Sequence, residues 1–94
     1  MNTNAELLYR EKRSHAGGFV ELVIWRVPEP VPPSEHPFKY RFVFIRNGIR
    51  VIGYDNERGK GDHKHLGGIE KTYNFINEIK LLEDFWQYVG EATK

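Results

Sequence analysis

The chain has 94 residues, of which 39% are hydrophobic and 14% aromatic, and this length allows one modest hydrophobic core but not a second domain. It has no cysteine, which excludes disulfide bonds and cysteine-ligated zinc, and it has no run near the roughly 20 apolar residues that span a bilayer. The formal net charge is only +1, but residues 39–64 hold seven basic and three acidic residues, which indicates one anion-facing surface. Because Met1 to Glu11 also lacks the apolar run of a secretion signal, we expect one cytoplasmic domain, residues 1–94, with no membrane contact.

Two strands are predicted before the proline-rich part of the chain. Ala5 to Arg13 has the imperfect alternation of a half-buried strand, and Ala16-Gly17-Gly18 supplies a turn. Phe19 to Val27 is almost continuously apolar, which is typical of a strand covered on both faces. The five prolines between Pro28 and Pro37 exclude a helix or an interior strand, so we expect a stiff loop that joins two strands.

A β-hairpin is predicted from Lys39 to Asp55. Lys39 to Arg46 alternates aromatic and polar residues, and Ile49 to Asp55 continues the strand character. Asn47-Gly48 between them suits a type I′ turn, because asparagine and glycine tolerate positive φ best. The alternate aromatic residues could stack on RNA bases, but their spacing favours a place in the core, which we also expect for the two tryptophans: Tyr40, Phe42, Phe44, Trp25 and Trp86.

One amphipathic helix is predicted after Asn77. Asn77 can cap its start, and Gly90 is placed to end it. Its apolar stripe has helical spacing and consists of Leu82, Phe85, Trp86 and Val89. We therefore expect an α+β fold, in which a meander-like antiparallel β-sheet of about four strands is packed by one C-terminal α-helix.

The segment from Tyr54 to Gly68 contains little that could build a core, yet it concentrates glycine, basic residues and histidine. RNA cleavage without a metal needs a base for the 2′-OH, an acid for the departing 5′ oxygen and a cation for the phosphorane. His63 and His65 point to the same side of an extended segment, with Cα atoms roughly 7 Å apart, and can flank one phosphate. Arg58 would be the bidentate phosphate clamp.

The remaining candidate site residues fall into two groups. The expected RNA- or phosphate-binding residues are Lys60, Lys64, Arg41 and Arg50. The expected supporting residues are Tyr54, Asp55, Glu57 and Asp62. The sequence thus predicts an RNA substrate and a catalytic set of His63, His65 and Arg58.

Three other interpretations of this segment have to be weighed. It can be an exposed polar hairpin end without chemistry. Outside the segment, His15 and His36 are likewise expected to be surface residues and not catalytic ones. It can also bind RNA or an acidic partner without cutting it, through its basic residues and those of the preceding hairpin. A metal site made of Asp62, His63 and His65 is disfavoured, since neighbouring residues seldom converge on one ion, so we expect no metal and no cofactor.

Several motifs together resemble the TumE-type toxins of toxin–antitoxin systems, a family earlier catalogued as a domain of unknown function. They are WRVPEPVP at residues 25–32, SEH at 34–36, FKYR at 38–41, YDNERGKGDH at 54–63 with His65, and DFW at 84–86. The resemblance covers nearly the whole chain. It implies a toxin that is neutralised by direct binding of a cognate antitoxin, typically a helix-turn-helix DNA-binding protein. A homodimer is a further expectation, because an exposed strand beginning at Ala5 or Lys39 could pair with a second copy.

Overall fold

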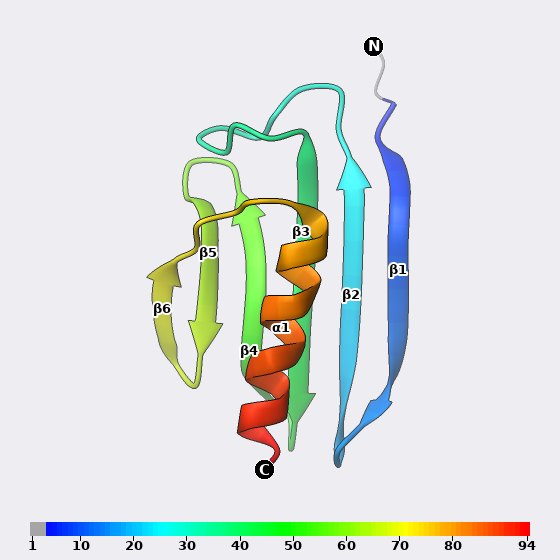
Figure 1. Cartoon of the computed structure of the whole chain (residues 1–94), viewed down its shortest axis with the longest axis vertical. Helices are drawn as coiled ribbons and strands as arrows, with labels where there is room; N and C mark the ends of the chain where they lie inside the picture. Colours follow the sequence, from blue (N-terminus) through cyan, green and yellow to red (C-terminus); the bar gives the residue numbers. More distant parts are fainter. Residues whose placement is uncertain (1–3) are drawn as a thin grey trace.

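The computed structural model describes residues 4–94 as one antiparallel sheet with a helix packed on it (Figure 1). Met1 to Thr3, part of the segment examined for a secretion signal, lie outside the described residues. The elements in chain order are β1 (Glu6–His15), β2 (Gly18–Arg26), β3 (Phe38–Arg46), β4 (Ile49–Glu57), β5 (Gly61–Leu66), β6 (Ile69–Thr72) and α1 (Glu78–Ala92). Each strand pairs with the next, so the predicted α+β meander is confirmed.

The sheet has six strands, not about four. The two additional strands, β5 and β6, fold the segment after Asp55 back along β4. β5 carries polar residues on both faces, and every residue of β6 is exposed, so neither shows the apolar alternation that marks a strand in sequence. The turn between them, Gly67-Gly68, has φ values of 59° and 93° and links the strands by two residues, like Asn47-Gly48 at 56° and 73°.

The helix begins where its cap predicts and ends later than predicted. The Asn77 side chain accepts a hydrogen bond from the Lys80 backbone N–H at 2.8 Å, which satisfies a free donor of the first turn. Gly90 does not end the helix, which continues to Ala92, where Thr93 closes it with a backbone bond to Val89. The deeply buried stripe is Leu81, Phe85 and Val89, while Leu82 and Trp86 pack beside it.

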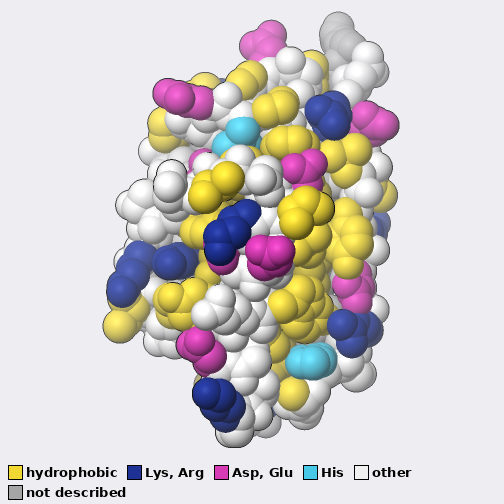
Figure 2. Space-filling model, viewed as in Figure 1, with side chains coloured by type: hydrophobic (Ala, Val, Ile, Leu, Met, Phe, Trp, Pro, Cys, Tyr) yellow, Lys and Arg dark blue, Asp and Glu magenta, His cyan; other side chains and the backbone are white. Residues whose placement is uncertain are grey.

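The core lies between α1 and one face of β2, β3 and β4. Its strand residues alternate along the chain and include Val20, Leu22, Ile24, Tyr40, Phe42, Phe44, Ile52 and Tyr54. The Phe85 ring meets Phe42 edge-to-face, with ring centroids 5.4 Å apart. Burying a side chain of this size stabilises the fold by about 1.5–3 kcal/mol, so this contact fixes the helix to the sheet. A column of hydrophobic side chains also lies beside the helix, on the side toward β2 (Figure 2).

The other side of the sheet, which we call the open face, has no helix or strand of residues 4–94 packed on it (Figure 1). The prediction that residues 19–27 are covered on both faces is therefore wrong, and Trp25 lies half-buried on the open face rather than in the core. The expected homodimer needs an exposed strand at Ala5 or Lys39. β1, which begins next to Ala5, is an edge strand. β3, which contains Lys39, pairs with strands on both sides and cannot pair with a second copy. Within the described part of the chain, no helix has the length and apolar character that a membrane span requires.

Candidate functional site on the open face

Strand register places the site residues in two rows across the open face. One row, read from β1 to β6, is Arg10, Val23, Arg41, Asp55, His63 and Thr72. The adjacent row is Lys12, Glu21, Val43, Gly53, His65 and Glu70. Because side chains alternate along a strand, the two rows share one face, and directly opposite residues are within contact distance. Two histidines, one aspartate and several basic residues therefore occupy a single surface.

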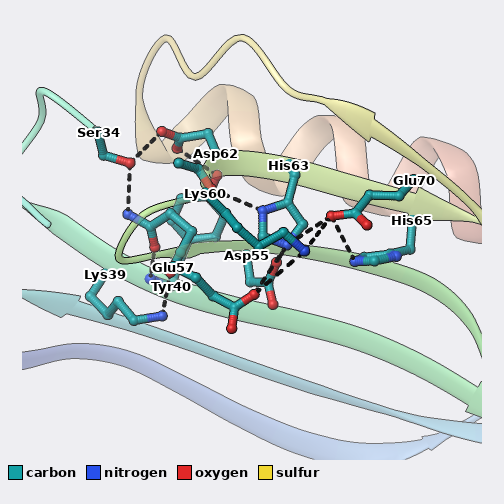
Figure 3. Close-up of polar contacts among 12 residues, drawn as sticks. Ser34, Lys39, Tyr40, Asp55, Glu57, Lys60, Asp62, His63, His65 and Glu70 are labelled. Atoms are coloured by element: carbon teal, nitrogen blue, oxygen red, sulfur yellow. Dashed lines mark hydrogen bonds and ion pairs between the residues drawn. The ribbon is translucent and has the colours of Figure 1, made fainter. Parts of the chain in front are cut away.

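His63 is the buried centre of this surface, with only 4% of the residue exposed. Its Nδ1 lies 2.9 Å from the backbone carbonyl of Gly61, and its Nε2 lies 2.5 Å from Oδ1 of Asp55 (Figure 3). The Nε2–Oδ1 contact is short, yet neither of these two buried atoms has a hydrogen-bond partner among the described residues. The contact is an ion pair only when His63 is protonated.

Three charged side chains cover His63. The carboxylates of Glu57 and Glu70 each lie 3.6 Å from its Nε2, and the Lys60 amine bridges them at 3.9 and 2.7 Å (Figure 3). These side chains are roughly half exposed, and ion pairs of this kind contribute only about 0–1 kcal/mol. These three side chains, which we call the cover, can therefore move away from His63 at a small cost in free energy. A pocket of about 280 Å³ adjoins it and is lined in part by Lys60, His63 and Glu70.

His65 lies beside His63, with ring centroids 5.2 Å apart, and is itself mostly buried. Gly53 lies opposite His65 on β4, and because glycine has no side chain, the Arg50 side chain lies close to its backbone. A methyl group on Gly53 would be 3.1 Å from Cδ of Arg50 and 3.6 Å from Cδ2 of His65. Burial, and next the positive charge of Arg50, lowers the pKa of His65 below its ordinary value of 6.5, against the opposing charge of Glu70. This shift favours the neutral form of the His65 imidazole.

The structure separates the other predicted residues by face. Arg58 is exposed in the three-residue turn between β4 and β5, and no ion pair of residues 4–94 includes it. Lys64 lies on the helix side, with its amine 5.3 Å from the ring centre of Tyr88. Tyr54 is in the core under α1, where burial raises the pKa of its hydroxyl. Among the supporting residues, only Asp55 and Glu57 adjoin the histidines.

Asp62 belongs to a different polar cluster on the helix side. Its carboxylate accepts hydrogen bonds from Ser34 at 2.5 Å and Tyr40 at 2.7 Å, and it lies 2.8 Å from Nε2 of His36. His36 is consequently not the surface residue that its position between prolines predicts. The Gly59 N–H also donates to the carbonyl of Pro32 at 2.9 Å, so the proline-rich loop braces the β4–β5 turn that carries the site.

Glu70 is the site residue that the sequence pattern does not predict. It pairs with Lys60, lies 3.9 Å from Nε2 of His65 and faces His63. Its place follows from the Gly67-Gly68 turn, which sets Glu70 directly opposite His65. That glycine pair, read as a two-residue hairpin, is the signal that could have identified it.

The fold and the cluster define a small α+β protein whose histidine and carboxylate groups lie on an open sheet face instead of in an enclosed cavity. A family model described as Toxin TumE matches residues 3–93, and the chain belongs to this toxin family. No curated protein and no solved structure matches it. Family membership makes the chain the toxin component of a toxin–antitoxin module, with a cognate antitoxin as its partner.

Proposed function

We propose that this toxin is an endoribonuclease that cleaves RNA without a metal ion, with His65 as general base and His63 as general acid. The observation that carries the proposal is the pair of imidazoles on one open face, 5.2 Å apart, with Asp55 against one of them. Cleavage by the 2′-OH needs a base and an acid within reach of one phosphate group. An open face also suits a polymer, which must lie across the surface instead of entering a cavity.

The proton transfers follow from the surroundings of each ring. Neutral His65 takes the proton of the 2′-OH, and the 2′ oxygen attacks the phosphorus. The bond from phosphorus to the 5′ oxygen breaks, and the Nε2 proton of His63 passes to that oxygen. The products are a 2′,3′-cyclic phosphate and a 5′-hydroxyl end. The Gly61 carbonyl at Nδ1 orients the His63 ring, and Asp55 lies against the Nε2 atom that gives up the proton.

Basic residues of the open face supply the phosphate contacts. Arg50 lies beside His65, and Arg41 is directly opposite Asp55, so each can bind a phosphate next to the cleaved bond. Lys60 can exchange its exposed ion pair with Glu70 for an RNA phosphate, and this exchange opens the cover over His63. Arg58, in the adjacent turn, would bind the next phosphate along the strand.

A product assay in EDTA tests the proposal. Purified toxin, freed from its antitoxin and from any affinity tag, is incubated with RNA, and the new ends are identified by mass spectrometry. We expect 2′,3′-cyclic phosphate and 5′-hydroxyl ends. Products with 3′-hydroxyl ends would contradict the mechanism, and salt-sensitive RNA binding without any product would favour the non-enzymatic binding alternative.

A further inference from the structure

We infer that Asp55, His63 and His65 form a binding site for a divalent transition-metal ion of the Zn²⁺ type, and that this ion inhibits the toxin. The binding half of the inference stands on the geometry alone. The inhibition half rests on the proposed function, because it requires that the same imidazoles transfer protons. Zinc titration tests the binding half, and RNA cleavage tests the inhibition half.

The hydrogen bonds of His63 indicate a cation between its Nε2 and the Asp55 carboxylate. A carbonyl oxygen only accepts hydrogen bonds, so the Nδ1 atom that faces Gly61 must carry a hydrogen. In a neutral ring Nε2 then has a lone pair, and a carboxylate oxygen of Asp55 lies only 2.5 Å from that nitrogen. Both atoms are buried and lack a hydrogen-bond partner among the described residues. Either a proton or a metal ion between them removes this repulsion.

Three ligand atoms converge at this point. One atom each from Asp55, His63 and His65 lies within 4.8 Å of the other two. A tetrahedral ion with bonds of about 2.0–2.1 Å holds its ligand atoms roughly 3.3 Å apart. Small side-chain rotations would therefore complete the site. They would move the Asp55 carboxylate away from Nε2 of His63 and bring the His65 ring closer to both. All three residues stand on the paired strands β4 and β5, which fix their backbones.

The atoms around the cluster fit a metal site. The Gly61 carbonyl orients His63 through Nδ1, as outer partners of metal-bound histidines commonly do. Glu57 and Glu70, each 3.6 Å from Nε2 of His63, add negative charge, and either carboxylate can supply a fourth ligand. Two imidazoles with one carboxylate favour Zn²⁺, Co²⁺ or Ni²⁺ over Mg²⁺ and Ca²⁺, which prefer oxygen ligands.

Metal binding and RNA cleavage compete for the same lone pairs. A bound ion occupies Nε2 of His63 and a ring nitrogen of His65, so neither ring can give or take a proton at that atom. Cleavage without metal and inhibition by metal are thus two consequences of one arrangement of residues.

Zinc titration of tag-free toxin, followed by calorimetry, tests the binding half. We expect one Zn²⁺ per chain, with an affinity at least about tenfold lower in Asp55→Asn and in His65→Gln, since even outer partners of a metal site contribute that much. His15→Ala, which alters a histidine packed on Trp86 outside the cluster, is the matched control and should bind as the wild type does. Circular dichroism establishes that each variant is folded.

Replacement of zinc by Co²⁺ gives a second readout. Visible absorption should appear in the wild type and be lost in Asp55→Asn, and excess Mg²⁺ should not displace the ion. Absence of zinc binding, or equal binding by the folded Asp55→Asn and His65→Gln variants, would overturn the site.

RNA cleavage then tests the inhibition half. Zinc should stop cleavage at concentrations that match its affinity, and EDTA should restore it. Zinc that binds at these residues without slowing cleavage would overturn inhibition. Failure of the proposed function is distinguishable, since it would appear as an absence of cleavage in EDTA while zinc still binds.

Discussion

His63 and Asp55 face each other across β4 and β5, with Nε2 of one 2.5 Å from Oδ1 of the other. The Gly61 carbonyl fixes which nitrogen of His63 carries a hydrogen, so this contact needs a shared proton or a metal ion. The same relationship therefore supports both proposals. A proton at Nε2 makes His63 a general acid, and a metal ion in that place removes this ability.

The pH dependence of cleavage should respond to Arg50. His65 must be neutral to act as a base, so activity should rise with pH through the pKa of His65, which lies below 6.5. The positive charge of Arg50 disfavours the charged imidazole, so Arg50→Gln should raise this pKa and move the acid limb of the kcat/KM profile to higher pH. The profile is measured in EDTA to exclude bound metal.

Arg46→Gln is the matched control for this experiment. Arg46 donates to the carbonyl of Ala92 at the end of α1, away from the open face, so its replacement should leave the acid limb in place. An acid limb that stays fixed or moves to lower pH in Arg50→Gln would contradict the role of His65 as the base.

RNA binding should distinguish the two faces of the sheet. Arg41→Gln should weaken binding and reduce the slope of log affinity against log salt by about 0.7, the value for one lost contact to a single-stranded phosphate. Lys64→Gln removes the same charge from the helix side, where the amine lies over Tyr88, and should change neither quantity. Fluorescence anisotropy at several salt concentrations measures both. A larger loss of RNA affinity in Lys64→Gln than in Arg41→Gln would place the RNA on the helix side of the sheet, which would contradict the proposal.

The fold could be predicted where local chemistry decides it. Asn47-Gly48 specified a hairpin because few other residues accept two positive φ values, and Asn77 specified the start of the helix through its capping side chain. β5 and β6 could not be found by apolar alternation, because they lie at the edge of the sheet, where both faces carry polar residues. The end of the helix was not predicted either, because α1 continues past Gly90 to Ala92, which packs against the core.

The candidate site could be predicted only in part, because its contacts cross between strands. His63 and His65 share a face by simple alternation, and this was visible in sequence. Asp55 is eight positions before His63 and meets it through the β4–β5 register, which requires both strands to be known. The same register separates Lys64 from the histidines, although it lies between them in the chain.

Ser34→Ala should lower the free energy of unfolding by about 1–3 kcal/mol, because it leaves a buried oxygen of Asp62 and the amide of Asn56 with fewer partners. Urea denaturation measures the change. Glu35→Ala, at the exposed neighbouring position, should stay within about 0.5 kcal/mol of the wild type. Equal stabilities of the two variants would show that the proline-rich loop does not depend on this cluster.

The most direct test of the central claim is the rate of RNA cleavage in EDTA by the His63→Ala, His65→Ala double variant, compared with wild type and His15→Ala. General acid and base catalysis typically contribute about 10²–10⁴-fold each, so we expect the double variant to lose at least about 10²-fold in rate while the control keeps its activity. A folded double variant that cuts RNA at the wild-type rate would contradict the assignment of these two histidines.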